Sequence, residues 1–445
     1  MHKSKFLVLI SALLIITFFS LSATAEEMEI SLTEAAEILL ENNRQLQNSR
    51  QNIEKAEKDV DLSGRGYYPT ANLQTSYTKM ESGQMTFNPD FSFTNPNSEL
   101  FVEGPDENYR TSLSLNQPLY LGGRVRIGKD ISELGLEMSR IEYQKQLDQS
   151  LFNLVQSYYG VLQAQGMVEI RQNALDVVNE HLRIVKVNNE AGTSLRQDLL
   201  QTQIEQRKAE KDLIAAENQL QIARKRLAQL LGDSSQSYAV STPEKNPDPE
   251  TELDKLINIA LENRAELRSL NINQKMIEKQ KELEGNPYRP QISLNGSYNW
   301  QGSELDFSDG SWNLTLSGSI PLYDGGKANL NEEKKEIEAS NLQNSKVDLE
   351  ESIKIEIEDT LLSLKHSEEM IELEQLSLEN AEENLELTNK SYQAGIGTNI
   401  DVINAQTSYE QAQISLLQAE YNYEINLYKL LYNTGRISEL FKDVI

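Results

Sequence analysis

Few side chains in this sequence are of a type that could perform chemistry together. The chain has no cysteine, and its histidines are His2, His181 and His366. His181 and His366 stand at unrelated positions on charged segments that we predict to be helical, where a histidine is most often an exposed surface residue. The sequence also lacks an HExxH motif, a Ser/His/Cys catalytic arrangement and a glycine-rich phosphate loop after a strand. We therefore expect no catalytic residues, no metal and no cofactor.

Two aspartates stand at matching places, just after breaks in the helical pattern. Asp198 follows Ala191-Gly192, and Asp401 follows Ala394-Gly395. An acid in the first turn stabilises the helix that it begins. The positions of Asp198 and Asp401 allow this role for both residues.

The N-terminus has the pattern of a secretory signal. Lys3 and Lys5 precede the short apolar run Phe6–Phe19, and Ala23-Thr24-Ala25 supplies small residues at cleavage spacing. A single membrane anchor is the alternative, but the run is short for a span of about 20 residues. We predict a signal peptide over 1–25 and export of the mature chain.

The charge balance argues against a nucleic-acid partner. The chain has 42 basic and 69 acidic residues, and removing Lys3 and Lys5 leaves 40 against 69, a net charge of −29. Binding to phosphates needs a basic face. The acidity fits a solvated periplasmic surface or a passage that prefers cations, and it fits acid for solubility or a saline habitat equally well.

The chain contains two copies of one unit. Leu40-Glu41-Asn42 recurs as Leu261-Glu262-Asn263, and Pro118-Leu119-Tyr120 recurs as Pro321-Leu322-Tyr323. An insertion in the loop 79–109 accounts for the change of spacing between these matches. Ser and Pro residues mark a linker between the copies. We predict a first repeat over 26–233, a linker over 234–251, a second repeat over 252–435 and a tail over 436–445.

Each repeat is predicted to read helix, strand, strand, helix, helix. Ser31 and Glu34 form a predicted capping box at the first helix. Apolar residues recur every seven positions from Leu147 and from Ile357, which indicates helices wound as a left-handed supercoil. The predicted elements are helices 31–64, 124–190 and 195–231 with strands 70–78 and 109–117, then helices 253–284, 327–393 and 399–433 with strands 291–300 and 312–320.

The strands alternate apolar and polar residues. Their length suits a tilted membrane strand, and an ordinary soluble hairpin packed on a helix is the alternative. Four strands cannot close a barrel, and an open sheet edge does not occur in lipid. Two chains would supply 8 strands and three would supply 12. The predicted fold is therefore mainly α with a small membrane β part, completed by other copies of the chain.

These features together resemble the TolC family of outer-membrane efflux channels. The resemblance covers nearly all of the mature chain and rests on the turns Gln117–Gly123 and Pro321–Gly326, the duplicated Ala-Gly break, and Tyr392–Ile403. It implies a homotrimer with a 12-stranded barrel and a 12-helix periplasmic α-barrel. It also implies a periplasmic adaptor and an inner-membrane pump or ABC exporter as partners, in addition to outer-membrane lipid.

The resemblance also implies roles for individual residues. Asp401 matches an acidic pore position, Asn404 stands where a second acid is expected, Tyr392 matches a tip residue of the closed state, and Asp198 is the twin of Asp401. Symmetric copies of an aspartate around a pore axis would produce a negative field that favours cations. This role and that of stabilising a helix start both remain open for the two aspartates. Gly397 replaces an expected arginine, which argues against a charge-paired latch of the family's kind. The predicted adaptor-docking tip comprises Ala191, Gly192, Thr193, Ala394, Gly395, Gly397 and Thr398. The predicted strand-to-helix turns comprise Pro118, Gly122, Gly123, Pro321, Gly325 and Gly326.

The expected function is a passive exit duct for efflux or type I secretion, in the outer membrane with a long periplasmic part. The alternative is a structural coiled-coil protein of the envelope, either an adaptor or a tether, without a pore. No residue identifies the cargo.

Overall fold

The computed structural model describes residues 28–79, 85–88, 91–97, 99–103, 107–234, 236–243, 250–285, 287–304, 307–308, 310–442 and 444. The predicted signal peptide, 1–25, lies outside the described residues. The chain is mainly helical with a small strand part, as predicted. It forms two compact units. Unit 1 takes in the described parts of Met1–Gln51, Ile141–Arg268 and Lys346–Ile445, and unit 2 those of Asn52–Arg140 and Ser269–Ser345.

The first helix of each repeat is interrupted, where the sequence predicted a continuous one. A single extended residue, Asn43 or Arg264, separates the two parts. Asn43 caps the second part, because its Oδ1 accepts the backbone N–H of Gln45 at 2.9 Å and of Leu46 at 3.1 Å. The four helices are α2 (Leu32–Asn42), α3 (Arg44–Gly64), α6 (Leu253–Asn263) and α7 (Ala265–Glu284). The predicted capping box of Ser31 and Glu34 is confirmed at α2.

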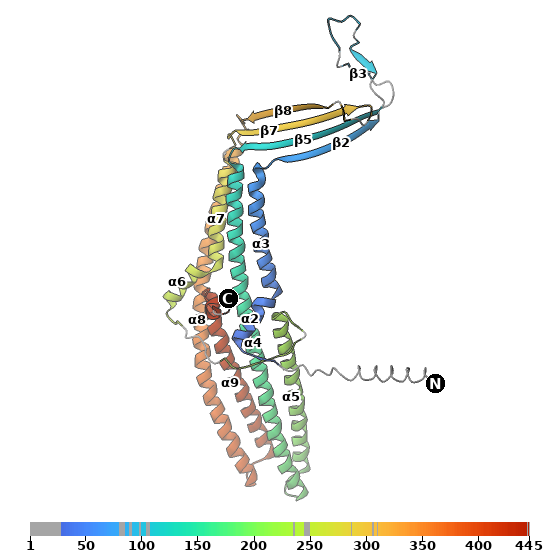
Figure 1. The fold of residues 1–445 in the computed structure, drawn as a ribbon. Coiled ribbons are helices and arrows are strands. Elements are labelled where there is room, and N and C mark those ends of the chain that lie inside the picture. Colours follow the sequence, from blue (N-terminus) through green and yellow to red (C-terminus); the bar gives the residue numbers. More distant parts are fainter. Residues whose placement is uncertain are drawn as a thin grey trace, which may run out of the picture. The chain divides into compact units, whose positions relative to one another are not determined.

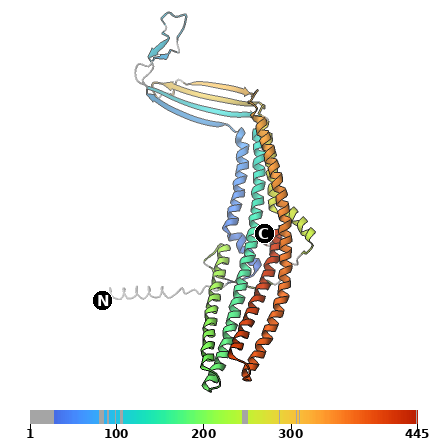
Figure 2. The ribbon, with the colours of Figure 1, turned by 180° about the vertical axis from the view of Figure 1, so that it is seen from behind.

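The long helices preserve the duplication to the residue. They are α4 (Arg124–Glu190) and α8 (Lys327–Gln393), each of 67 residues, and α5 (Arg196–Leu230) and α9 (Asn399–Asn433), each of 35 residues. Both views show α4 beside α5 and α8 beside α9 (Figures 1 and 2). Within the described residues, no helix combines the length and the hydropathy that crossing a membrane requires.

The seven-residue spacing is confirmed where the core of unit 1 is most densely packed. Leu147, Leu154 and Val161 of α4 are buried, and so are Ile357 and Leu364 of α8. The α4 residues pack with α2, the strands β1 (Met28–Ile30) and β6 (Tyr238–Val240), and the end of α5 in one apolar cluster. Burying such side chains gains about 1.5–3 kcal/mol each, so this region supplies much of the cohesion of the unit.

Farther along α4 the buried stripe leaves the predicted positions. Leu175 and Leu182 are only half-buried, whereas Val178 and Val185 are buried. A straight α-helix drifts by about 20° per heptad relative to a strict seven-residue repeat. A small change of the apolar spacing therefore turns a different set of residues toward the neighbouring helices.

The sheet of unit 2 joins the two repeats. Its strand order is β2-β5-β7-β8, and every neighbouring pair is antiparallel. The central pair consists of one strand from each repeat, and the edges are the outer strands (Figure 1). The strands are β2 (Thr70–Lys79), β5 (Glu107–Leu121), β7 (Gln291–Gly302) and β8 (Ser311–Ser319). A register shift between Pro118 and Tyr120 allows β5 to extend beyond its predicted end.

The sheet has one apolar and one polar face. The register places Leu73, Leu113, Tyr298 and Trp312 in one row across all four strands. Leu73 and Trp312 are 69% and 74% exposed, so this apolar face is not covered by the chain itself.

The opposite face of the sheet carries serine and asparagine side chains that bond across strands. Ser112 Oγ donates to Asn299 Oδ1 at 2.7 Å, and Ser297 Oγ donates to Asn313 Oδ1 at 3.0 Å. A sheet that is polar on one side and exposed and apolar on the other fits a boundary between water and lipid.

Three predicted loop or tail segments carry structure. The linker contains β6 (Tyr238–Val240), which pairs in parallel with β1 (Met28–Ile30). The tail contains the 3₁₀ helix η2 (Ile437–Phe441), whose end residues are buried. The insertion contains the hairpin of β3 (Met85–Phe87) and β4 (Phe101–Glu103). The linker was predicted without structure because β6 pairs with a strand from the start of the described chain. The tail was predicted without structure because η2 is buried in a core cluster that includes residues of α2 and α4, which lie far away along the chain.

Asp148 is an acid buried in unit 1. Its Oδ1 accepts Gln144 Nε2 at 3.0 Å, and burial raises its pKa to about 6 from 3.8. The folded protein therefore binds a proton more readily than the unfolded chain, and this group lowers stability as the pH rises from about 3.8 to about 6.

We expect Asp148→Asn to stabilise the protein at about pH 7.5, because the amide keeps an acceptor for Gln144 and removes the charge. A pKa of about 6 instead of 3.8 corresponds to at most about 3 kcal/mol. The thermal unfolding midpoint should rise at about pH 7.5 and stay unchanged at about pH 3.5. The repeat equivalent Glu351 is exposed, so Glu351→Gln is the control. An unchanged midpoint for Asp148→Asn at both pH values would contradict the prediction.

Candidate functional site

The two helical breaks in unit 1 have the same backbone geometry. Gly192 and Gly395 follow α4 and α8 in the left-handed region, with φ of +75° and +76°. In each turn the glycine N–H and the following N–H donate to carbonyls of the last helical turn, at 3.1 and 2.8 Å after α4 and at 3.1 and 3.0 Å after α8. This is a Schellman ending, which glycine adopts without strain. The predicted Ala-Gly breaks are therefore two sharp reversals between long helices.

The helices after the breaks begin differently. Thr398 caps α9, because its Oγ1 accepts the Asp401 N–H at 3.3 Å and the Asp401 carboxylate accepts the Thr398 N–H at 3.1 Å. The Thr398 hydroxyl also donates to the Asp401 carboxylate, and this bond together with the bond from the Thr398 N–H lowers the pKa of Asp401. Leu195 occupies the corresponding place before α5 and offers no acceptor, although Asp198 still accepts its N–H at 3.2 Å. Both aspartates thus stabilise helix starts, which was one of the two roles left open.

A buried polar cluster joins the two repeats beside the breaks. His181 of α4 is 4% exposed, so its expected position on the surface is wrong. Its Nε2 lies 2.8 Å from Oδ1 of Asn399 in α9. Thr202 of α5 places its hydroxyl 3.1 Å from the same oxygen and 2.9 Å from the carbonyl oxygen of Asp198. Burial lowers the pKa of His181, which keeps the imidazole neutral.

Tyr392 of α8 lies at the edge of this cluster. Its ring is 5.2 Å from the His181 ring in an edge-on arrangement, and burial raises the pKa of its hydroxyl. The structure therefore brings Tyr392 and Asp198 together with His181 and Asn399, two residues for which the sequence offered no signal. Asp401 and Asn404 stand apart from the cluster as exposed side chains of α9.

The strand-to-helix turns belong to unit 2. Both use two successive glycines with positive φ. The angles are +63° and +82° at Gly122 and Gly123, and +74° and +81° at Gly325 and Gly326. Pro118 lies at the register shift of β5, whereas Pro321 lies beyond the end of β8.

The two glycine turns differ in their surroundings. A Cβ on Gly122 would lie 2.8 Å from Cβ of Arg289, whereas nothing lies within 4 Å of one on Gly325. In the second turn Asp324 caps α8, accepting the N–H of Gly326 at 2.9 Å and of Ala328 at 2.8 Å. The first turn has Leu121 at that place, so the same backbone route is stabilised in two ways.

The architecture and the site define a class of protein: duplicated chains with long antiparallel helices and a sheet that is apolar on one face only. A model of the "Outer membrane efflux protein" family matches residues 35–233 and 256–436. The chain belongs to this family, whose members are channel proteins, and the suspected resemblance to TolC-like channels is confirmed.

Individual relatives agree with this assignment. The alkaline protease secretion protein AprF of Pseudomonas aeruginosa is 22% identical over 96% of this chain and 89% of its own length. The outer membrane protein TolC of Vibrio cholerae is 22% identical over 70% of this chain and 74% of its own. The crystal structure of the CmeC outer membrane channel of Campylobacter jejuni superposes with a TM-score of 0.74 at 17% identity, covering 93% of this chain and 89% of that one.

We expect His181 to make stability depend on pH. Because the pKa of His181 is lowered in the folded protein, the unfolded chain binds a proton at higher pH than the folded chain does. The stabilisation that the neutral imidazole gives to the folded state is therefore complete above about pH 6.5 and is lost as the pH falls. His181→Gln keeps an amide donor for Asn399 without titrating. The fall of the thermal midpoint between about pH 7.5 and about pH 5.5 should be smaller in this variant. His366→Gln, at an exposed position, should behave as the wild type, and equal slopes in all three proteins would refute the role of His181.

Gly122 and Gly325 form a matched pair for testing the turns. Alanine at either position adopts an unfavourable φ at a cost of roughly 1 kcal/mol. Gly122→Ala also meets Arg289, so it should lower the free energy of unfolding by about 2 kcal/mol or more. Denaturant unfolding of the two variants measures both changes in the free energy of unfolding. Equal effects of the two variants would show that the approach of Arg289 is unimportant.

Proposed function

We propose that the protein is the outer-membrane exit duct of an efflux or type I secretion system, through which substrates pass passively. The observation that carries the proposal is the sheet of unit 2, whose exposed apolar face suits lipid and whose edges, β2 and β8, require strands from elsewhere. Membership of the outer membrane efflux protein family supports the same function. AprF, named as an alkaline protease secretion protein, supports a role in secretion, and the name of the family supports a role in efflux.

Closure of the sheet requires identical copies. The antiparallel order would continue if β8 of one copy paired with β2 of the next, and three copies would give a 12-stranded barrel. The long helices would then form the periplasmic α-barrel. We propose this homotrimer, with the N-terminal signal removed on export to the outer membrane.

The breaks are the proposed adaptor-docking tip. Leu195 and Ile396 are 68% and 83% exposed there, and exposed apolar residues on a rigid turn fit a protein partner. An inner-membrane pump or ABC exporter would act through that adaptor. These assignments rest on the family and on the exposure of the breaks.

The decisive experiment is planar-bilayer recording of the detergent-purified protein, together with its mass. A trimer with stepwise conductance is expected. A monomer without conductance would favour the alternative function, a coiled-coil adaptor or tether without a pore.

We propose that Asp401 also lines the pore near the breaks, because it is exposed and ionised. Asp401→Asn keeps an acceptor for the Thr398 cap and removes one charge per copy. The ratio of cation to anion permeability should fall, since a ring of carboxylates attracts cations.

Reversal potentials in a salt gradient measure this ratio. Glu262→Gln makes the same charge change at an exposed position of α6 and is the control. Selectivity that is unchanged in Asp401→Asn, or equally reduced in both variants, would remove Asp401 from the pore.

A further inference from the structure

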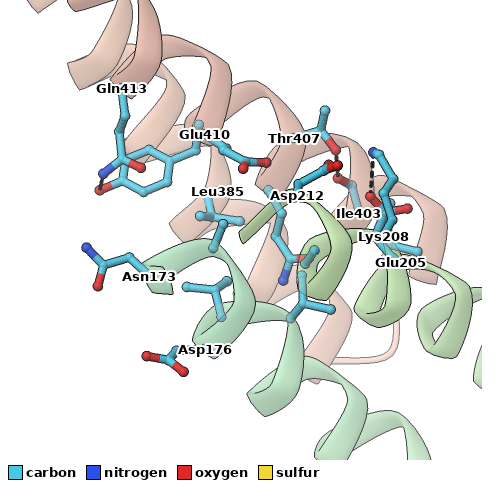
Figure 3. Close-up of a pocket in the computed structure, with 16 residues that line it drawn as sticks. Asn173, Asp176, Glu205, Lys208, Asp212, Leu385, Ile403, Thr407, Glu410 and Gln413 are labelled. Carbon is cyan, nitrogen blue, oxygen red and sulfur yellow. Dashed lines mark hydrogen bonds and ion pairs between the residues drawn. The ribbon is translucent and has the colours of Figure 1, made fainter. Parts of the chain in front are cut away.

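The helices of unit 1 line a partly open cavity of about 320 Å³ near the buried polar cluster. Its walls come from α4 and α5 of the first repeat and from α8 and α9 of the second (Figure 3). The volume is at the lower end of the range for ligand pockets, which suits a small molecule. None of the roles assigned above uses this cavity.

An unpaired acceptor lies in the wall. Gln406 of α9 is 9% exposed, and its Oε1 has no hydrogen-bond partner within the described residues. Leaving a buried acceptor unpaired destabilises the folded state, because the group loses its bonds to water and gains none in return. A ligand that donates an N–H to this oxygen would recover part of that loss.

The wall is predominantly acidic. Its charged side chains are Asp176, Glu205, Asp212 and Glu410 against one ammonium, Lys208. Figure 3 shows Glu205, Lys208 and Asp212 on α5 opposite Glu410 on α9.

The chain's own cations balance these acids only in part. Lys208 Nζ lies 2.8 Å from Glu205 Oε1, and its pKa is raised by that bond and by the charges of Glu205, Asp212 and Glu410. Arg171 pairs with Glu410, and Lys211 Nζ lies 3.5 Å from Asp212 Oδ1, both from outside the lining. Four carboxylates thus face three cations. The wall therefore still favours a cation.

The apolar part of the wall distinguishes an organic cation from a metal ion. Leu385, Ile403 and the ring of Tyr409 contribute to the lining, and an aromatic ring attracts ammonium groups. Among the described residues, no three acidic, imidazole or thiol side chains gather as metal ligands. The acids are thus too dispersed for a metal and are arranged around an apolar surface.

We propose that this cavity binds a small organic ammonium ion with an apolar body, its N–H group directed at Gln406 Oε1 and its charge opposed by the carboxylates of Glu205, Asp212 and Glu410. Because the walls belong to both repeats, the bound ion stabilises the packing of α4 and α5 against α8 and α9 by mass action. The inference is independent of the proposed duct function.

Isothermal titration calorimetry of the full-length protein in detergent tests the proposal, with benzylammonium chloride as the probe. Benzyl alcohol is the uncharged analogue, and sodium chloride at equal ionic strength controls for salt. Saturable heat is expected for benzylammonium alone. Its absence from the wild-type protein would overturn the proposal.

Two variants locate the binding. Gln406→Leu removes the acceptor and should weaken benzylammonium binding about tenfold or more. Gln411→Leu, at an exposed position of the same helix, should bind as the wild type. Asp212→Asn should also weaken binding, which keeps the test informative if Gln406→Leu fails to fold. Undiminished binding in a folded Gln406→Leu or Asp212→Asn protein would place the probe elsewhere and refute the site.

Discussion

Backbone hydrogen bonding at the edges of the sheet is the constraint on which the rest of this structure depends. β2 and β8 each bond to one neighbour in the described sheet, so their other sides present N–H and C=O groups. In lipid each unsatisfied group costs several kcal/mol. The apolar row that includes Leu73 and Trp312 would be unfavourably exposed if this face of the sheet were in water. In the proposed ring of identical copies, pairing of β8 with β2 of the next copy would satisfy both conditions and give every copy the same surroundings.

Duplication and divergence have separate roles in unit 1. The lengths of the long helices and the glycine turns are the same in both repeats, which preserves the route of the chain. Side chains that meet at the repeat junction differ instead. Asn399 corresponds to Arg196, and Thr202 corresponds to Ala405. One repeat therefore supplies a histidine and a hydroxyl, the other supplies an amide, and the cluster can form in only one pairing of the helices.

The sequence predicted what local periodicity controls. Seven-residue spacing and alternating strands placed the long helices and the sheet within a few residues of their ends. Features decided by distant partners were missed. At the break in the first helix, Asn43 Nδ2 donates to Leu230 O, 187 residues away. β1 and β6 are too short to recognise before they pair. His181 is buried because three other helices meet around it, and the cavity beside Gln406 has no sequence signal at all.

Packing quality varies along the long helices in a way that suits the position of the breaks. Around Leu154 the contacts are apolar and continuous, and such a core resists small changes because its shape is complementary. Near the breaks the helices meet through His181, Asn399 and Thr202 and around a cavity. Polar junctions specify an arrangement more than they stabilise it, and a cavity forfeits dispersion contacts. The free energy that holds the two helix pairs together is therefore smallest at the end where the chain reverses direction, so rearrangement there disturbs the apolar core least.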